Sequence, residues 1–262
     1  MAVRSRLVVT SPIGSALVLL TVMGCADSTS DFDQQEAEQL DRRKVLLCQQ
    51  GLSDRVTGWD KGLFELCESV EEEGFELVRD GDHPAFGALD ENGAYNALFE
   101  TLDTNRDGRV DGRDEPTAVH LVGFSWGGVN ITDIARRLSA DRRTAPGSGG
   151  VMAMVLLDAY QPFHGRLDIP RSVYLTWVYR QSETTDDDCS HDVSFGYGYR
   201  GLEPRQASDA LGFCVDVDLE DVATGVGHCG VVDVAADAAF HNLTTRHDYA
   251  PWAEAARACV LD

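Results

Sequence analysis

The sequence has few basic residues, with 22 Lys and Arg against 44 Asp and Glu and a formal net charge of -22 at pH 7. A protein that binds nucleic acid or an anionic membrane surface through charge needs a basic patch. The acidic residues are spread along the chain, apart from short runs at Glu71–Glu73 and Asp186–Asp188. The composition therefore disfavours both kinds of partner and predicts a solvated acidic surface.

Long apolar segments are also missing. The most apolar N-terminal stretch, residues 7–22, is broken by Ser11 and Pro12 and is too weak for a transmembrane helix. Two arginines precede it, and the first acidic residue is Asp27. This pattern predicts a signal peptide over residues 1–24.

The end of that segment, Val22-Met23-Gly24-Cys25, resembles a bacterial lipobox. The resemblance implies that Cys25 carries lipid and anchors an exported protein to a bacterial membrane, on the periplasmic or cell-surface side. An ordinary signal peptide cleaved nearby, or an uncleaved anchor, is the alternative. Residues 25–43 are polar and acidic and are predicted to form a tether.

Cysteine spacings typical of zinc sites are absent, since the chain has neither a CxxC pair nor a Cys/His cluster. Besides Cys25, six cysteines remain, an even number that suits an oxidising compartment. They are Cys48, Cys67, Cys189, Cys214, Cys229 and Cys259. Up to three disulfides are expected, with the connectivity open; buried free thiols are the alternative.

Short apolar runs alternate with segments of helical periodicity. Strands are predicted at 44–48, 75–78, 118–122, 151–157, 173–179 and 215–223, and helices at 59–73, 94–102, 127–138, 234–240 and 252–258. The fully apolar run 151–157 suits a buried parallel strand. The pattern predicts a single α/β domain over residues 44–262, with a mostly parallel sheet and helices on both faces.

A glycine-rich turn, Gly123-Phe124-Ser125-Trp126-Gly127, joins the strand at 118–122 to the helix at 127–138. So sharp a reversal holds the serine in a strained conformation with its hydroxyl projecting, and the two glycines avoid collisions with neighbouring backbone. The N–H groups of the following helix then face a developing oxyanion. Ser125 is therefore a candidate nucleophile; a structural turn serine is the alternative.

With this turn at a strand–helix junction, residues 44–260 resemble the α/β-hydrolase superfamily. The resemblance implies a Ser-His-acid triad with Ser125 as nucleophile. The first strand of such folds commonly ends in His-Gly and an apolar residue, where this chain has Gln50-Gly51-Leu52. The expected oxyanion donors are the backbone N–H groups of Trp126 and Leu52.

The superfamily places its base in a loop after the last strand. His228 occupies such a place, in the glycine-rich loop 224–230 after the predicted strand 215–223. His241 and His247 lie later in the chain and are the alternatives. The remaining histidines precede the expected position and are assigned structural roles: His83, His120, His164 and His191.

The acid must accept the N–H of the base and lie between Ser125 and His228 in the chain order of this superfamily. Asp158 ends the strand at 151–157 and resembles the acid of pancreatic-type lipases. Asp186, three residues before Cys189, resembles the acid of cutinases, and Glu183 lies nearby. Asp158 is favoured, with Asp186 as the alternative acid.

Residues 103–114 match an EF-hand calcium loop, with glycine at position six and Asp114 at position twelve, as in dockerin-type loops. The predicted ligands are Asp103, Asn105, Asp107, the carbonyl of Arg109, and Asp114, with Asp111 acting through water. A helix precedes this loop but a strand follows it, so a single structural site is expected. A solvated acidic loop is the alternative.

These features predict a lipid-anchored serine hydrolase of carboxylic esters, esterase- or lipase-like, with structural calcium and no organic cofactor. Its substrate would be a small-molecule or lipid ester. A calcium-binding interaction lipoprotein on an inactive hydrolase scaffold is one alternative, and a thioesterase or amidase with the same triad is another. Residues 181–214 are expected to form either a cap over the site or a plain surface loop.

Overall fold

The computed structural model describes residues 42–51, 61–161, 165–182, 200–210, 212–222, 226–228, 230–244 and 252–261. The predictions for the signal peptide, for Cys25 and for nearly all of the tether lie outside these residues. So do the following predicted site residues and cysteines: Leu52, Glu183, Asp186, Cys189, Cys229 and His247. Within the described ranges, no helix has the length and apolar character needed to cross a membrane.

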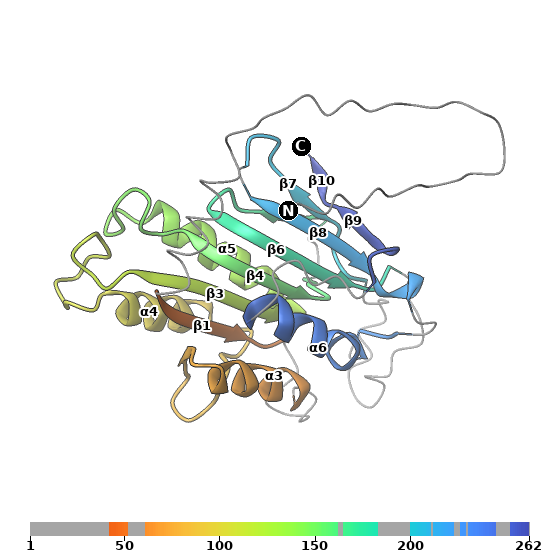
Figure 1. Cartoon of the computed structure of the whole chain (residues 1–262), viewed down its shortest axis with the longest axis horizontal. Helices are drawn as coiled ribbons and strands as arrows, with labels where there is room; N and C mark the ends of the chain where they lie inside the picture. Colours follow the sequence, from red (N-terminus) through yellow and green to blue (C-terminus); the bar gives the residue numbers. More distant parts are fainter. Residues whose placement is uncertain are drawn as a thin grey trace, which may run out of the picture. The chain divides into compact units, whose positions relative to one another are not determined.

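A twisted, mostly parallel sheet runs through the domain (Figure 1). Within the described residues it has seven strands, in the order β2-β1-β3-β4-β6-β8-β9. The parallel strands are β1 (Arg43–Gln49), β2 (Glu76–Val78), β3 (Thr117–Phe124), β4 (Val151–Leu157), β6 (Val173–Arg180) and β8 (Phe213–Asp218). The last strand, β9 (Ala256–Ala258), pairs antiparallel with β8. A smaller parallel sheet joins β5 (Leu167–Ile169), β7 (Pro204–Gln206) and β10 (Val260–Leu261).

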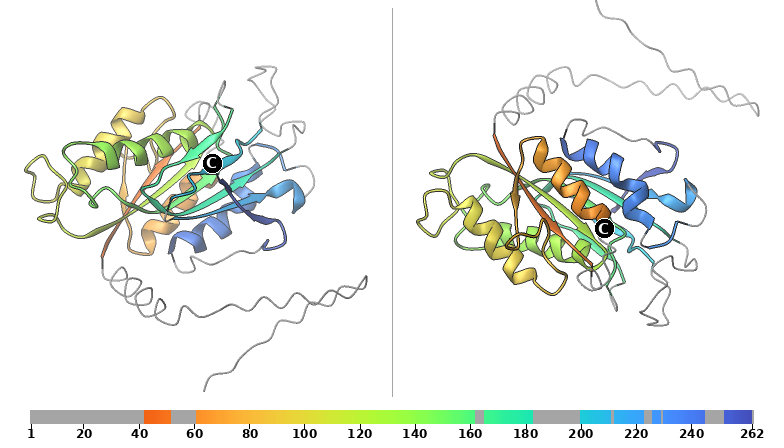
Figure 2. Two further views of the ribbon diagram at one scale, coloured as in Figure 1. Left: turned by 90° about the horizontal axis from the view of Figure 1, so that it is seen from above. Right: turned by 90° about the horizontal axis from the view of Figure 1, so that it is seen from below.

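Helices cover both faces of the large sheet, as Figure 2 shows. One face carries α4 (Glu91–Leu102) and α5 (Trp126–Ala140), and the other carries α3 (Lys61–Glu72) and α6 (Gly230–Thr244). This arrangement follows from the parallel pairing, because each crossover between parallel strands must leave the plane of the sheet. The mostly parallel sheet with helices on both faces confirms the predicted α/β fold class.

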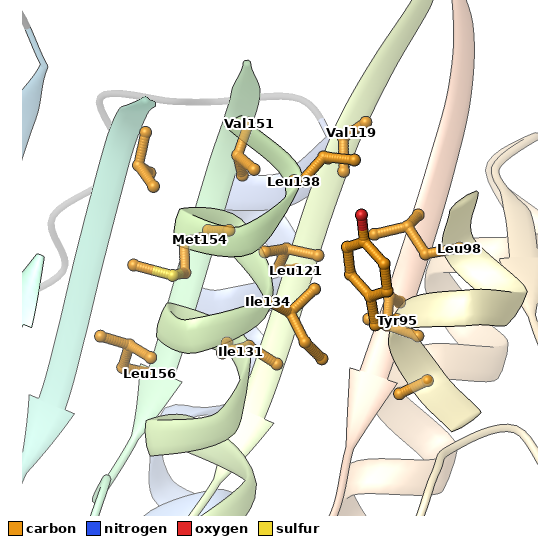
Figure 3. Close-up of a cluster of buried hydrophobic side chains, with 14 of the residues drawn as sticks. Tyr95, Leu98, Val119, Leu121, Ile131, Ile134, Leu138, Val151, Met154 and Leu156 are labelled. Carbon is orange, nitrogen blue, oxygen red and sulfur yellow. The ribbon is translucent and has the colours of Figure 1, made fainter. Parts of the chain in front are cut away.

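The core explains why the strand at 151–157 is fully apolar. Met154 faces the α4/α5 side and Val155 faces the α3/α6 side, and both are fully buried. On the first side, Ile131 and Ile134 from α5 pack over β3 and β4 (Figure 3). A strand covered on both faces has no solvent side on which a polar residue is favoured.

Predictions for the later part of the chain were partly wrong. Residues 252–258 do not form a helix, because 256–258 form β9 and pair with β8. The helix propensity of alanine is a weak preference that strand pairing overrides. The strand predicted at 215–223 ends at Asp218, whose side chain caps a short 3-10 helix, Leu219–Asp221. The smaller sheet was not predicted.

Two disulfides join described cysteines, as expected for an oxidising compartment. Cys48 at the end of β1 pairs with Cys67 in α3, and Cys214 in β8 pairs with Cys259 beside β9. The first fixes a covering helix to the sheet, and the second fixes the antiparallel edge strand. Both therefore link elements that meet only in the folded state.

Candidate active site

Ser125 occupies the turn between β3 and α5, with φ 55° and ψ -126°. A non-glycine residue with positive φ is strained by about 1–3 kcal/mol and needs neighbours that hold it in place. Here the Ser125 N–H donates to the carbonyl of Leu157 at 3.0 Å, and the Tyr160 N–H donates to the Ser125 carbonyl at 3.0 Å. The end of β4 and the turn after it therefore fix both peptide groups of the serine.

The glycines on either side of Ser125 allow close backbone packing. A Cβ atom on Gly123 would lie 2.5 Å from the Gly127 carbonyl oxygen. A Cβ atom on Gly127 would lie 2.2 Å from the Gln49 carbonyl oxygen and 2.4 Å from that of Gln50. The start of α5 thus rests directly on the end of β1, the strand that leads to the predicted donor Leu52.

Gly127→Ala should destabilise the protein by about 1–3 kcal/mol, because the colliding atoms belong to backbone and cannot rotate away. At an ordinary helix position, glycine to alanine would instead stabilise by about 1 kcal/mol. Urea denaturation of the variant measures the difference. Gly165→Ala is the control, since a Cβ atom there meets nothing within 4 Å. A stable Gly127→Ala variant would contradict the close packing of α5 on β1.

Three polar side chains from separate parts of the chain meet at the carboxyl end of the sheet. His228 Nε2 lies 2.8 Å from Ser125 Oγ, and His228 Nδ1 lies 2.5 Å from Asp158 Oδ2. Asp158 is fully buried, and Ser125 and His228 are exposed by only 8% and 7%. With Nδ1–H donating to the carboxylate, Nε2 is left to accept the serine proton.

Aromatic rings enclose the imidazole. The Phe124 ring stacks on His228 with centroids 4.9 Å apart and an interplanar angle of 29°. Tyr160 approaches edge-on, at 6.2 Å and 73°. No pattern in the sequence predicts these contacts, although Phe124 lies within the glycine-rich turn. Together the rings limit rotation of the imidazole away from Ser125.

Asp158 follows β4 directly, and its backbone φ is 44°. Its N–H donates to the Tyr179 carbonyl at 2.6 Å, and its Oδ1 accepts from the Gln181 N–H at 2.9 Å. One carboxylate oxygen is thus held by backbone while the other faces His228. The structure brings Asp158 to the base, whereas Asp186 and Glu183 lie outside the described residues.

The other described histidines lie in structural surroundings. His120 is buried within β3 with its ring against Phe75. His83 forms a backbone bridge with Asp80, and His241 lies in α6 beside Asp237. The burial of His120 fits the structural role predicted for it, whereas the side chain of His83 is exposed. His164, His191 and His247 lie outside the described residues.

The predicted oxyanion donor Trp126 is the first residue of α5. N–H groups in the first turn of a helix have no acceptor within the helix, and they carry the positive end of its dipole. Gln50, which replaces the histidine expected before Gly51, is buried, and its N–H donates to the Phe86 carbonyl at 2.8 Å. The end of β1 is therefore fixed by backbone contacts.

The loop over residues 103–114 is closed by its own polar side chains. Asp103 accepts hydrogen bonds from the N–H groups of Asp107 and Gly108, at 3.0 and 2.8 Å. Asp114 accepts from the N–H groups of Asn105 and Asp111, at 3.2 and 2.8 Å. The glycine at position six has φ 81°. The backbone is therefore organised around the predicted ligand residues.

Arg113 offsets part of the negative charge of this loop. Arg113 lies 2.6 Å from an oxygen of Asp107 and 2.7 Å from one of Asp111. Its side-chain hydrogen bond lowers the pKa of Asp111 to about 2. Among the described residues, no group of three or more His, Cys, Asp and Glu side chains is arranged to hold a metal ion. The all-oxygen donor set suits calcium, but its carboxylates do not converge here.

The same loop is joined to the turn that follows α5. The Val110 N–H donates to the Arg143 carbonyl, and the Ala145 N–H donates to the Val110 carbonyl, both at 2.9 Å. α5 has 15 residues, which corresponds to roughly 22 Å between this turn and Ser125. The loop precedes β3 in sequence, yet it contacts the end of α5 that is remote from the candidate active site.

No protein-family model matches the chain, and no curated protein matches it. Among solved structures, it is similar to a crystal structure from Pectobacterium atrosepticum that is provisionally described as a YdeN-like hydrolase. The two are 15% identical, and the similarity covers 79% of this chain and 96% of the other, with a TM-score of 0.33. A likeness of this size carries no argument about the reaction, so any assignment of function must come from the geometry of the site.

Proposed function

We propose that the protein is a serine hydrolase that acts on carboxylic esters. The observation that supports this most directly is the continuous hydrogen-bonded series from Ser125 Oγ through His228 to Asp158. A serine hydroxyl is a weak nucleophile by itself and becomes reactive when an adjacent base takes its proton. The buried carboxylate fixes the imidazole and stabilises its protonated form.

In the proposed reaction, Ser125 Oγ attacks the ester carbonyl carbon while its proton moves to His228 Nε2. The backbone N–H groups of Trp126 and Leu52 stabilise the negative oxygen of the tetrahedral intermediate. The intermediate collapses as His228 returns the proton to the leaving alcohol, and Ser125 remains acylated. Water, deprotonated by His228, then releases the carboxylic acid.

An ester is a less demanding substrate than an amide for this set of residues, because an alcohol leaves more readily than an amine. Thioesters and amides are the alternative substrates for the same three residues. The proposed setting is the exported face of a bacterial membrane, with lipid on Cys25. That setting rests on the sequence of residues 22–25 and on the cysteines expected for an oxidising compartment.

Reaction with a fluorophosphonate probe tests the proposal, because this probe modifies serines activated by a neighbouring base. The native protein should be labelled stoichiometrically, and mass spectrometry of the digest should locate the label on the peptide that contains Ser125. Heat-denatured protein is the control and should remain unlabelled. An unlabelled but folded protein would overturn the proposal and favour an interaction protein on an inactive scaffold.

We also propose that the loop at 103–114 binds calcium and stabilises the fold. The ligands would be Asp103, Asn105, Asp107, the Arg109 carbonyl and Asp114, with Asp111 through water. This arrangement requires Arg113 to release Asp107, so calcium would replace one source of positive charge with another. The backbone bonds of Val110 to the turn after α5 support a role in stability and not in the reaction itself.

Calcium at 100 times its dissociation constant should stabilise the protein by about 2.7 kcal/mol. For a domain of this size, the melting temperature should rise by about 5–10 °C, while kcat stays unchanged. Thermal unfolding with calcium, with magnesium and with a chelator measures the effect. Asp107→Ala should remove the response, because alanine has no oxygen to offer the ion. If the melting temperature does not respond to calcium, the loop is an acidic surface loop held by Arg113.

A further inference from the structure

Gly201 packs directly against the proposed catalytic acid. A Cβ atom on this buried glycine would lie 2.2 Å from Asp158 Oδ1 and 2.6 Å from Arg180 Cβ. Contacts below 3.0 Å cannot be accommodated without movement. A side chain at position 201 must therefore displace the carboxylate or the strand end that carries Arg180, or move the backbone of residue 201 away from them.

Backbone hydrogen bonds hold Gly201 against the acid. The Gly201 N–H donates to the Gln181 carbonyl at 3.1 Å, and the Leu202 N–H donates to the Ala159 carbonyl at 2.9 Å. The chain at 201–202 thus connects the residue that follows β6 to the residue that follows Asp158. The Gln181 N–H donates to Asp158 Oδ1. The backbone of Gln181 therefore holds the acid through its N–H and the glycine through its carbonyl.

A buried ion pair also fixes the end of β6. Arg180, the last residue of β6, donates from Nε and Nη2 to the two oxygens of Asp216 on β8, both at 2.9 Å. Asp218 lies 3.5 Å from Nη1. A bidentate contact of this kind restricts the orientation of the arginine side chain as well as its distance from the carboxylate. It fixes the strand end from which the Gln181 N–H reaches Asp158.

We propose that Gly201 is a positioning residue for Asp158, with the Arg180–Asp216 pair holding the strand end on which it rests. This inference depends on the proposed function. Gly201 takes no part in proton transfer. Its absent side chain leaves the space in which Asp158 can accept from Gln181 with one oxygen and face His228 with the other.

Gly201→Ala should lower kcat for an ester substrate by about 100-fold, which is typical of a displacement of about 1 Å in a catalytic group. KM should change little, because the acid does not contact the ester. The double variant with Asp158→Asn provides the decisive comparison. If Gly201 acts through Asp158, Gly201→Ala should cost less than about 3-fold when Asp158 is already Asn.

Gly150→Ala is the matched control. Gly150 immediately precedes β4, the strand whose other end carries Asp158, and a Cβ atom there would meet only the Ser172 carbonyl oxygen, at 3.9 Å. This variant should retain the kcat of the native protein. Equal losses of kcat in the two alanine variants would overturn the inference, because they would indicate a general disturbance of the sheet.

Proton NMR gives a readout that does not depend on ester hydrolysis. His228 Nδ1 lies 2.5 Å from an oxygen of the buried Asp158 carboxylate, so the proton between these two atoms should give a strongly deshielded resonance. That resonance should persist in Gly150→Ala and disappear or shift in Gly201→Ala. An unchanged resonance in Gly201→Ala would overturn the positioning role. A native protein that shows this resonance but reacts with no probe would instead overturn the proposed function alone.

Discussion

Ser125→Ala should abolish both fluorophosphonate labelling and ester hydrolysis, with kcat falling about 10⁶-fold. The reason is chemical, since alanine has no oxygen to form the acyl-enzyme while every other contact of the site remains. The backbone bonds that hold this residue run through its N–H and carbonyl groups, which alanine retains. The variant should therefore fold as the native protein does.

Initial rates on short and long acyl esters, with urea denaturation of each variant, measure this effect. Ser139→Ala is the control, because Ser139 lies on the same helix and its hydroxyl bonds only the exposed carbonyl of Arg136. Hydrolysis that survives in Ser125→Ala would show that a contaminating enzyme or another nucleophile is responsible. In that case the proposed mechanism is wrong.

Asp158→Asn should lower kcat about 10⁴-fold with little change in KM. An asparagine fits the same space but presents a neutral amide to His228 Nδ1. The imidazole then loses the charge that stabilises its protonated form, and the amide can favour the wrong tautomer. The fold should survive, because the Gln181 N–H can still find an acceptor in the amide oxygen.

The comparison with Asp186→Asn separates the two acids considered from the sequence. If Asp158 is the acid, Asp186→Asn should retain nearly all activity over the whole pH profile of kcat/KM. The reverse result, with a large loss only in Asp186→Asn, would assign the role to Asp186 and leave Asp158 a structural residue at the end of β4. Similar partial losses in both would indicate that neither acts alone.

The candidate site could be predicted where its signals are local. Ser125 lies in a strand–turn–helix sequence whose pattern spans a few residues, and the apolar strand at 151–157 ends directly at Asp158. His228 was predicted from the resemblance to the α/β-hydrolase superfamily, which places its base in a loop after the last strand. Each of these three residues follows a strand that hydrophobic periodicity can locate.

The supporting contacts could not be predicted in this way. Gly201 meets Asp158 across more than forty residues of chain, and nothing in the sequence around Gly201 distinguishes it from a loop glycine. The bond from the Gln181 N–H comes from backbone, which carries no sequence signal. Similarly, the bridge between Val110 and Thr144 depends on how α5 lies over the sheet. Such contacts form only when the helices, strands and loops have packed against one another.

The conformation of the backbone has a consequence for how this protein can change over time. In the part of the chain that the structure describes, three non-glycine residues have positive φ, and two of them are Ser125 and Asp158. Strain of about 1–3 kcal/mol at each is a large fraction of the roughly 5–15 kcal/mol by which a domain is stable. A descendant no longer selected for reactivity would gain stability by placing glycine at either position. At either position, relief of the backbone strain would therefore remove a side chain that the proposed reaction needs.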